Sequence, residues 1–247
     1  MRIAYCIQDF YRLGGMERIL SIKANYLAKH GFEVIIITTD QQGKHPYYPL
    51  SDSISCYDLN VNYSRSKNRI QYHNCITMHK EKLSELLYKI KADIVISMFS
   101  QETEFLPKIK DGSKKILELH YNHSIVMPRL HGLRGLYHKY KNKRRVKNIK
   151  KYDRFVVLTH EDKEAWKGFK NIKVISNPQT FKCDKTASLD NKRVIAVGRY
   201  HEVKRYNLLI DAWNIVHQEI KNWTLHIVGE GSLRETLQKQ IDTLGLN

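Results

Sequence analysis

Two cations beside a glycine are the strongest candidates for chemistry in this 247-residue sequence. In the stretch AVGRYHEVKRYN, Arg199 directly follows Gly198, and Lys204 stands five residues later, at the start of a helical pattern. A helix N-terminus favours acidic over basic side chains unless an anion is bound there. Arginine offers a planar fork of donors and lysine a mobile charge, so the pair suits a diphosphate better than it suits two solvated surface cations.

A pair of glycines, Gly14 and Gly15, separates a short apolar run from a helical pattern near the N-terminus. Glycine permits a sharp bend or the close approach of a ligand, and the first N–H groups of a helix favour an anion. A backbone cradle for a phosphate or sugar is one interpretation. A glycine turn needed only for packing is the other, because the spacing is not that of a dinucleotide-binding fingerprint.

A histidine, His120, directly follows the apolar run at residues 114–119, and Asn122 comes two residues later. A histidine at a strand end can accept a proton or hydrogen-bond a sugar hydroxyl near neutral pH. An ordinary polar loop histidine is the competing interpretation, because the chain holds twelve histidines.

A second glycine loop surrounds Glu230 in the stretch LHIVGEGSLRETL, where Gly229 and Gly231 stand between a strand pattern and a helical one. Ser232 and Glu235 have the spacing of a helix cap and its capping-box partner. We therefore predict that Ser232 caps the helix, whatever else the loop binds.

The elements that must position these residues alternate between apolar strand runs and helical patterns. Strands are predicted over residues 2–7, 33–39, 92–99, 114–119, 153–159 and 172–177, and again over 193–198 and 224–229. This alternation is typical of parallel sheets with crossover helices. In such sheets ligands bind beyond the carboxyl ends of the strands, where the candidate stretches lie.

The alternation is interrupted by a polar stretch without periodicity at residues 181–191. We predict a first Rossmann-like domain over residues 1–180, a linker over 181–191, and a second Rossmann-like domain over 192–247. The second domain has two strands and two helices, which are too few for a stable doubly wound domain. The predicted fold class is therefore α/β, with two doubly wound domains of which the second is incomplete.

The formal net charge of +17 implies an anionic partner. Residues 129–154 hold eleven lysines and arginines and one acid, and Leu133, Leu136, Tyr137 and Tyr140 share one face of the helix predicted there. Apolar anchors among cations are typical of a helix that lies on an anionic membrane surface. The predicted membrane-surface residues are Lys141, Lys143, Arg144, Arg145 and Lys147. A solvated helix is the alternative, and nucleic acid is less favoured because no recognised binding motif is present.

The four cysteines show no C-x-x-C pair and no clustering, which indicates reduced thiols and argues against a disulfide framework or a zinc site. The first apolar run is too short for a signal peptide, and no window approaches about 18 apolar residues. We therefore expect a cytoplasmic protein.

Four stretches in order along the chain resemble retaining glycosyltransferases of family 4, which have the GT-B fold: GGMERIL…LAKHGFEVIIITT, KVISNPQTF, AVGRYHEVKRYNLLIDAW and WTLHIVGEGSLRETLQKQIDTLGL. The resemblance covers essentially the whole chain. It implies a nucleotide-sugar donor held mainly by the C-terminal domain, an acceptor held by the N-terminal domain, and no required metal or cofactor.

The resemblance also implies roles for the candidate residues. Arg199 and Lys204 would bind the donor diphosphate and His120 would touch the transferred sugar, so these three are the predicted catalytic residues. The predicted donor- or acceptor-binding residues are Gly14, Gly15, Asn122, Gly198, Gly229, Glu230 and Gly231.

Two departures from the family pattern bear on activity. Arg205 stands where family members usually have a glycine, which adds charge beside Lys204. The paired glutamates that usually hold the donor sugar and ribose lie further along the family pattern than Asn247. We therefore expect efficient transfer to be impaired in a chain of this length.

The function predicted from the sequence is transfer of a sugar, with retention, from a nucleotide-sugar to a lipid-linked or surface-polysaccharide acceptor. The transfer would occur at the inner face of the plasma membrane. A non-catalytic homologue that binds only the acceptor is an alternative, and a basic nucleic-acid-binding module is a weaker one. Uridine, guanosine and adenosine diphosphate sugars all fit the motifs.

Overall fold

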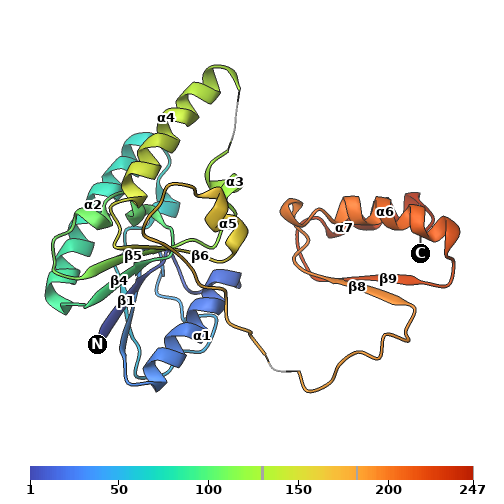
Figure 1. The fold of residues 1–247 in the computed structure, drawn as a ribbon, viewed down its shortest axis with the longest axis horizontal. Helices are drawn as coiled ribbons and strands as arrows, with labels where there is room; N and C mark the ends of the chain where they lie inside the picture. Colours follow the sequence, from blue (N-terminus) through green and yellow to red (C-terminus); the bar gives the residue numbers. More distant parts are fainter. Residues whose placement is uncertain (129–130, 182, 247) are drawn as a thin grey trace. The chain divides into compact units, whose positions relative to one another are not determined.

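The chain divides into two compact units, Met1–Phe181 and Lys182–Asn247 (Figure 1). The structure, a computed structural model, describes residues 1–128, 131–181 and 183–246, and the side chains of Leu133 and Arg134 lie outside this description. The division falls one residue after the predicted end of the first domain. Each unit is described by itself.

The first unit is built on a seven-stranded sheet in the order β3-β2-β1-β4-β5-β6-β7. Every neighbouring pair is parallel. Its strands are β1 (Arg2–Cys6), β2 (Glu33–Thr38), β3 (Ser55–Asp58), β4 (Ile94–Ser97), β5 (Lys114–Glu118), β6 (Arg154–Val157) and β7 (Ile172–Val174). The strand order reverses between β1 and β4, which makes the carboxyl ends of these two strands the expected ligand position.

Helices connect the strands and cover both faces of this sheet (Figure 1). They are α1 (Gly15–Lys29), α2 (Arg69–Ile90), α3 (His123–Val126), α4 (Gly132–Ile149) and α5 (His160–Ala165), with short 3-10 turns η1 (Tyr63–Arg65), η2 (Gln101–Glu104) and η3 (Leu106–Lys108). The predicted basic helix corresponds to α4. No helix in the described part of the chain is both long enough and apolar enough to cross a membrane.

Alternating strand residues feed two separate cores. Ala4 and Cys6 of β1 belong to the larger core, with apolar residues of α2 and α4. Ile3 and Tyr5 point to the opposite face and pack with Leu20 of α1. Because helices cover both faces of the sheet, the sequences of these strands are almost unbroken apolar runs. Such runs could be predicted as strands from the sequence.

The second unit is smaller, and its helices cover one face of its two-stranded sheet. Strands β8 (Arg193–Val197) and β9 (Thr224–Val228) are parallel, and they are followed by α6 (Tyr206–Glu219) and α7 (Arg234–Thr243), with η4 (Glu202–Lys204) ahead of α6. The fully buried core described here consists of Tyr206, Ile210 and Leu237. The predicted α/β class is therefore confirmed.

The predicted cap of the last helix is wrong. The residue at the N-cap of α7 is Leu233, and no side chain caps the helix. Backbone contacts explain the shift, because the Leu233 N–H donates to the Tyr200 carbonyl at 3.3 Å and the Arg234 N–H to the Gly231 carbonyl at 3.2 Å. These bonds extend the loop, so the N-cap lies one residue later than the predicted Ser232.

Candidate active site

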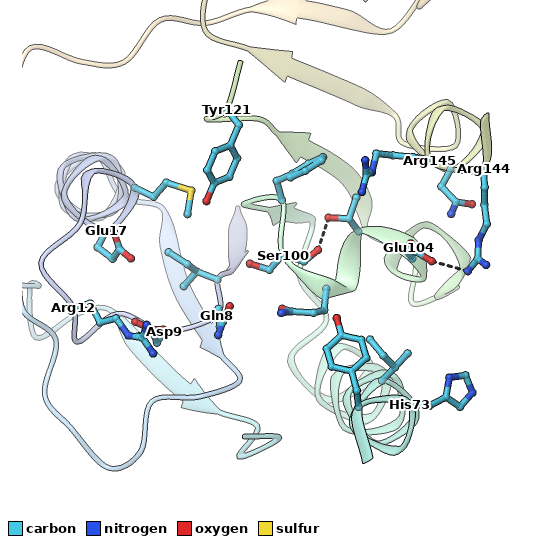
Figure 2. A pocket seen from close by; sticks show the side chains of 18 residues that line it. Gln8, Asp9, Arg12, Glu17, His73, Ser100, Glu104, Tyr121, Arg144 and Arg145 are labelled. Atoms are coloured by element: carbon cyan, nitrogen blue, oxygen red, sulfur yellow. Dashed lines mark hydrogen bonds and ion pairs between the residues drawn. The ribbon is translucent and has the colours of Figure 1, made fainter. Parts of the chain in front are cut away.

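A hollow of about 640 Å³ lies at the strand-order reversal of the first unit. Gln8 and Asp9 reach it from the end of β1, Ser100 from the end of β4, and Tyr121 from the loop after β5 (Figure 2). Helices α1, α2 and α4 complete its wall through Glu17, His73, Arg144 and Arg145, among other residues. We call this space the β1–β4 hollow.

The glycine pair stands at the N-terminus of α1, beside this hollow. The backbone of Gly14 is extended, with φ −147°, and Gly15 is the first helical residue. A side chain at Gly14 would overlap the Glu17 carboxylate, whereas a Cβ at Gly15 would meet nothing within 4 Å. Gly14 thus makes room for Glu17 and does not form a tight turn, and Gly15 leaves open space at the helix N-terminus.

Asp9 is a residue of the β1–β4 hollow that the sequence analysis missed. Its side chain is almost completely buried, and its Oδ2 lies 3.3 Å from the Arg12 guanidinium. Burial raises the pKa of Asp9, although the charge of Arg12 opposes the rise. Oδ1 is buried and has no hydrogen-bond partner in the described part of the chain. The available signal was its position, two residues after the buried run RIAYCI.

His120 takes part in a buried polar cluster just outside the β1–β4 hollow. Its Nε2 lies 3.1 Å from Oε1 of Glu118, and Lys23 of α1 forms an ion pair with the same carboxylate. Burial alone acts to raise the pKa of Glu118, but the hydrogen bond with His120 and the charge of Lys23 outweigh it, so the pKa is lowered.

This cluster fixes how the histidine is oriented. An ionised carboxylate accepts hydrogen bonds and does not donate, so Nε2 of His120 carries a proton. In the neutral ring Nδ1 is then the acceptor. The orientation of His120 is thus fixed by its hydrogen bond to Glu118.

Asn122 caps a short helix. It is the N-cap of α3, where its Oδ1 accepts from the Ser124 backbone N–H at 2.9 Å and from the Ser124 hydroxyl at 2.7 Å. Neither His120 nor Asn122 is among the residues that line the β1–β4 hollow. The loop after β5 therefore contributes Tyr121 to the hollow and holds its two predicted site residues beside it.

Two predicted membrane-surface residues belong to the wall of the β1–β4 hollow. Arg144 forms an ion pair with Glu104 of η2 at 2.6 Å (Figure 2). Arg145 donates to the Val126 carbonyl. Both side chains line the hollow. The structure thus places these two arginines in the wall of the hollow, where Arg144 is also exposed. Lys141, Lys143 and Lys147 are exposed and do not line it.

In the second unit, the two predicted ligand loops are joined to each other at the carboxyl ends of β8 and β9. The Tyr200 N–H donates to the Glu230 carbonyl at 2.7 Å, and the Tyr200 hydroxyl to the Ile227 carbonyl at 2.9 Å. A Cβ at Gly229 would overlap the Gly198 carbonyl, and one at Gly231, whose φ is +153°, would overlap the Tyr200 carbonyl. The glycines of this loop are required by the neighbouring backbone.

The predicted cations stand at the same edge. Arg199 and Lys204 are exposed, and neither forms an ion pair with a described residue. Lys204 approaches Gly198, since its Cε would lie 3.6 Å from a Cβ placed there. The next residue, Arg205, has φ +51° and caps α6 from the left-handed region. That conformation explains why glycine suits this position in the family pattern.

In comparisons with known proteins, two protein families match consecutive segments of the chain. Residues 13–178 match the family described as Glycosyltransferase Family 4, and residues 179–247 match Glycosyl transferases group 1. The chain belongs to glycosyltransferase family 4. Among family 4 relatives, an uncharacterized glycosyltransferase of Haemophilus influenzae is 29% identical over 99% of this chain and 66% of its own length. The amylovoran biosynthesis glycosyltransferase AmsD of Erwinia amylovora is 25% identical over 97% of this chain and 65% of its own.

Solved structures show that this family 4 chain has the GT-B fold. The lipopolysaccharide outer core galactosyltransferase WaaB matches all of the chain and 66% of its own, with 19% identity and a TM-score of 0.68. Sucrose-phosphate synthase from Thermosynechococcus elongatus matches all of the chain and 68% of its own, with 13% identity and a TM-score of 0.72. The chain spans just under two thirds of the length of the two curated relatives.

Proposed function

We propose that this family 4 chain belongs to a retaining glycosyltransferase that moves a sugar from a nucleotide-sugar donor to a lipid-linked or surface-polysaccharide acceptor. The observation that carries the proposal is the pair of exposed cations, Arg199 and Lys204, at the carboxyl edge of β8 and β9. Without a described counterion, this pair is arranged to receive an external anion.

The proposed reaction explains why two cations are needed. As the bond between the sugar and the nucleoside diphosphate breaks, negative charge grows on the leaving phosphate. Positive groups fixed at that position stabilise the transition state more than the ground state. Arg199 supplies paired donors and Lys204 a mobile charge, so we propose transfer without a metal or other cofactor.

The two proposed donor loops are bonded to each other, which suits this role. Tyr200 donates to the Glu230 carbonyl and Gly198 to the Val228 carbonyl, and Gly229 packs closely against Gly198. A preorganised site avoids reorganisation when charge develops. We propose that Glu230, with its flanking glycines, lies near the nucleoside.

The β1–β4 hollow is the proposed acceptor site. It combines aromatic rings with carboxylate and guanidinium groups, a mixture that suits a saccharide with many hydroxyls. The buried carboxylate of Asp9 lines this region, and Gly15 directly precedes the lining residues Met16 and Glu17. We propose that His120 contacts the transferred sugar through Nδ1. The names of AmsD and WaaB, which mention amylovoran biosynthesis and the lipopolysaccharide outer core, support a surface-glycan acceptor.

The exposed part of α4 supports a location at the inner face of the plasma membrane. Leu136, Tyr137 and Tyr140 are between 53% and 67% exposed, and Lys141 and Lys143 stand beside them. Apolar anchors and cations on one helix together favour binding to an anionic bilayer.

Nucleotide binding tests the proposal directly. We expect UDP, GDP or ADP to bind the chain in isothermal titration calorimetry, with one base preferred. Arg199→Gln and Lys204→Gln should each weaken binding about tenfold, as expected for the loss of one charge-assisted contact. Lys239→Gln, which removes an exposed lysine of α7, is the matched control. Absence of binding to all three nucleotides, or equal weakening by the control, would contradict the proposal.

A further inference from the structure

A second hollow, of about 330 Å³, lies between α3 and α4. It adjoins the β1–β4 hollow, because Phe99, Tyr121 and Arg145 line both. We call this space the α3–α4 hollow. The two hollows are therefore neighbours at these three side chains.

The lining of the α3–α4 hollow differs in charge from that of its neighbour. His138, Lys141 and Arg145 lie along one face of α4, at the spacing of successive helical turns, and all three line the α3–α4 hollow. No aspartate or glutamate is among its described lining residues, whereas Asp9, Glu17 and Glu104 line the β1–β4 hollow. The smaller hollow therefore favours an anion.

The two cations retain donors for such an anion. Arg145 donates through Nη1 to the Val126 carbonyl, which anchors the guanidinium against α3. A guanidinium carries five N–H donors, so this anchor leaves several for a ligand. Lys141 lies over the Tyr137 ring, with its Nζ 4.7 Å from the ring centre, and remains exposed. A held arginine beside a movable lysine suits a phosphate group.

Two exposed side chains with apolar surface adjoin this hollow. Ile125 of α3 lines it and is 61% exposed, and Tyr137 of α4, which is 53% exposed, lies beneath the ammonium group of Lys141. A ligand whose anionic group is held by Lys141 and Arg145 would thus have an aliphatic surface beside it on the way out.

We propose that the α3–α4 hollow binds the diphosphate of a lipid diphosphate-linked acceptor. The glycan of this acceptor would occupy the β1–β4 hollow, and its lipid would leave over Ile125 and Tyr137. This inference rests on the proposed function, and it narrows the acceptor from lipid-linked or polymeric glycans to a saccharide joined to a lipid by a diphosphate.

Binding of farnesyl diphosphate, a soluble lipid diphosphate, tests the inference. We expect the full chain to bind this probe and to bind farnesol at least tenfold more weakly. The double variant Lys141→Gln/Arg145→Gln should weaken farnesyl diphosphate binding at least tenfold. The control Lys139→Gln/Lys151→Gln removes the same charge from exposed residues outside the hollow and should change binding less than twofold.

Because Arg145 also anchors α3, Lys141→Gln alone and Lys141→Arg provide an independent comparison. The glutamine variant should weaken binding severalfold and the arginine variant should restore it. Equal weakening by the two double variants, or equal binding of farnesol and farnesyl diphosphate, would overturn the inference.

Binding to vesicles tells whether the anion that these cations bind belongs to a lipid diphosphate or to the bilayer surface. If Lys141→Gln weakens binding to phosphatidylcholine vesicles containing phosphatidylglycerol but not to farnesyl diphosphate, the cations serve the membrane surface and the inference is wrong. Titration of the same variants with UDP, GDP and ADP tests the proposed function separately. Retained nucleotide binding with no probe binding defeats the inference alone, and the reverse result defeats the proposed function alone.

Discussion

The strands of the two units have similar apolar composition but very different burial. In β1, four of the five residues are buried, whereas β8 has no buried residue, and Ile195 and Val197 are 63% and 71% exposed. The first sheet has helices on both faces, and the second packs α6 and α7 against one side. Apolar sequence alone therefore does not tell how much free energy a strand contributes, because the contribution depends on the surface that it removes from water.

Truncating one buried and one exposed strand residue should give the largest contrast. Phe155→Ala, in the centre of the larger core, should lower the free energy of unfolding of the first unit by about 4 kcal/mol, since it leaves a cavity. Val197→Ala should change the stability of the second unit by less than about 0.5 kcal/mol. Hydrogen exchange resolved by peptide segment measures each unit separately. A large cost at Val197 would show that this face is covered in solution.

The first unit also buries a carboxyl group, Glu102, which should make its stability depend on pH. Burial raises the pKa of Glu102 to about 7 although Ser97 donates a hydrogen bond to it at 2.6 Å. A pKa that is higher in the folded state gives stability that is complete below the unfolded value of 4.5 and is lost as the pH rises through 7. The loss corresponds to about 3 kcal/mol.

Urea unfolding at pH 5 and pH 8 measures this effect, and Glu102→Gln should remove most of the difference. Glu104→Gln, at an exposed position in the same turn, should leave it unchanged. A Glu102→Gln protein with the original pH dependence would assign the effect to other groups.

Replacing a glycine by alanine should change stability in opposite directions in the two units. Gly231→Ala places a Cβ against the Tyr200 backbone at φ +153°, so it should destabilise the second unit by about 2 kcal/mol. Gly15→Ala adds a methyl group to open space in a helical residue and should stabilise the first unit by about 0.5 kcal/mol. Thermal unfolding with segment-resolved exchange measures both. Stabilisation by Gly231→Ala would mean that the two loops are not packed as described.

A smaller effect than that at Gly231 is expected at Arg205. Its φ of +51° lies in the left-handed region, which costs a side-chain-bearing residue about 1 kcal/mol. Arg205→Gly should recover about this amount in the second unit, and Arg205→Ala should not. Chemical denaturation of the two variants side by side checks it, and equal stability of glycine and alanine would argue against the left-handed backbone.

Much of the architecture could be predicted because burial on both sheet faces leaves continuous apolar runs in the sequence. The strands at residues 33–39 and 114–119 were found in this way. Strand β3 was missed because its residues, SCYD, are mostly exposed and form no apolar run. The capping box at Ser232 was predicted from spacing alone, but contacts of the loop with Tyr200 moved the start of the helix.

The site was predictable only in part, for a related physical reason. The position of His120 after a strand was evident, but its partners depend on tertiary contacts, since Lys23 lies 95 residues before Glu118. Charge patterning likewise identified the basic helix without showing that Arg144 and Arg145 turn toward the β1–β4 hollow. Sequence periods identify elements, and pairwise contacts between distant elements decide which side chains meet.

The backbone bonds between the loops after β8 and β9 have a consequence for binding kinetics. Tyr200 joins the two loops by a hydrogen bond in the absence of a ligand. A nucleotide that binds there would meet a preformed surface, so binding would cost little conformational entropy. Association would then be governed mainly by diffusion and by attraction to Arg199 and Lys204. Differences among nucleotides would appear in residence times, and changes of nucleotide preference during evolution would come from side chains while the loop path stays the same.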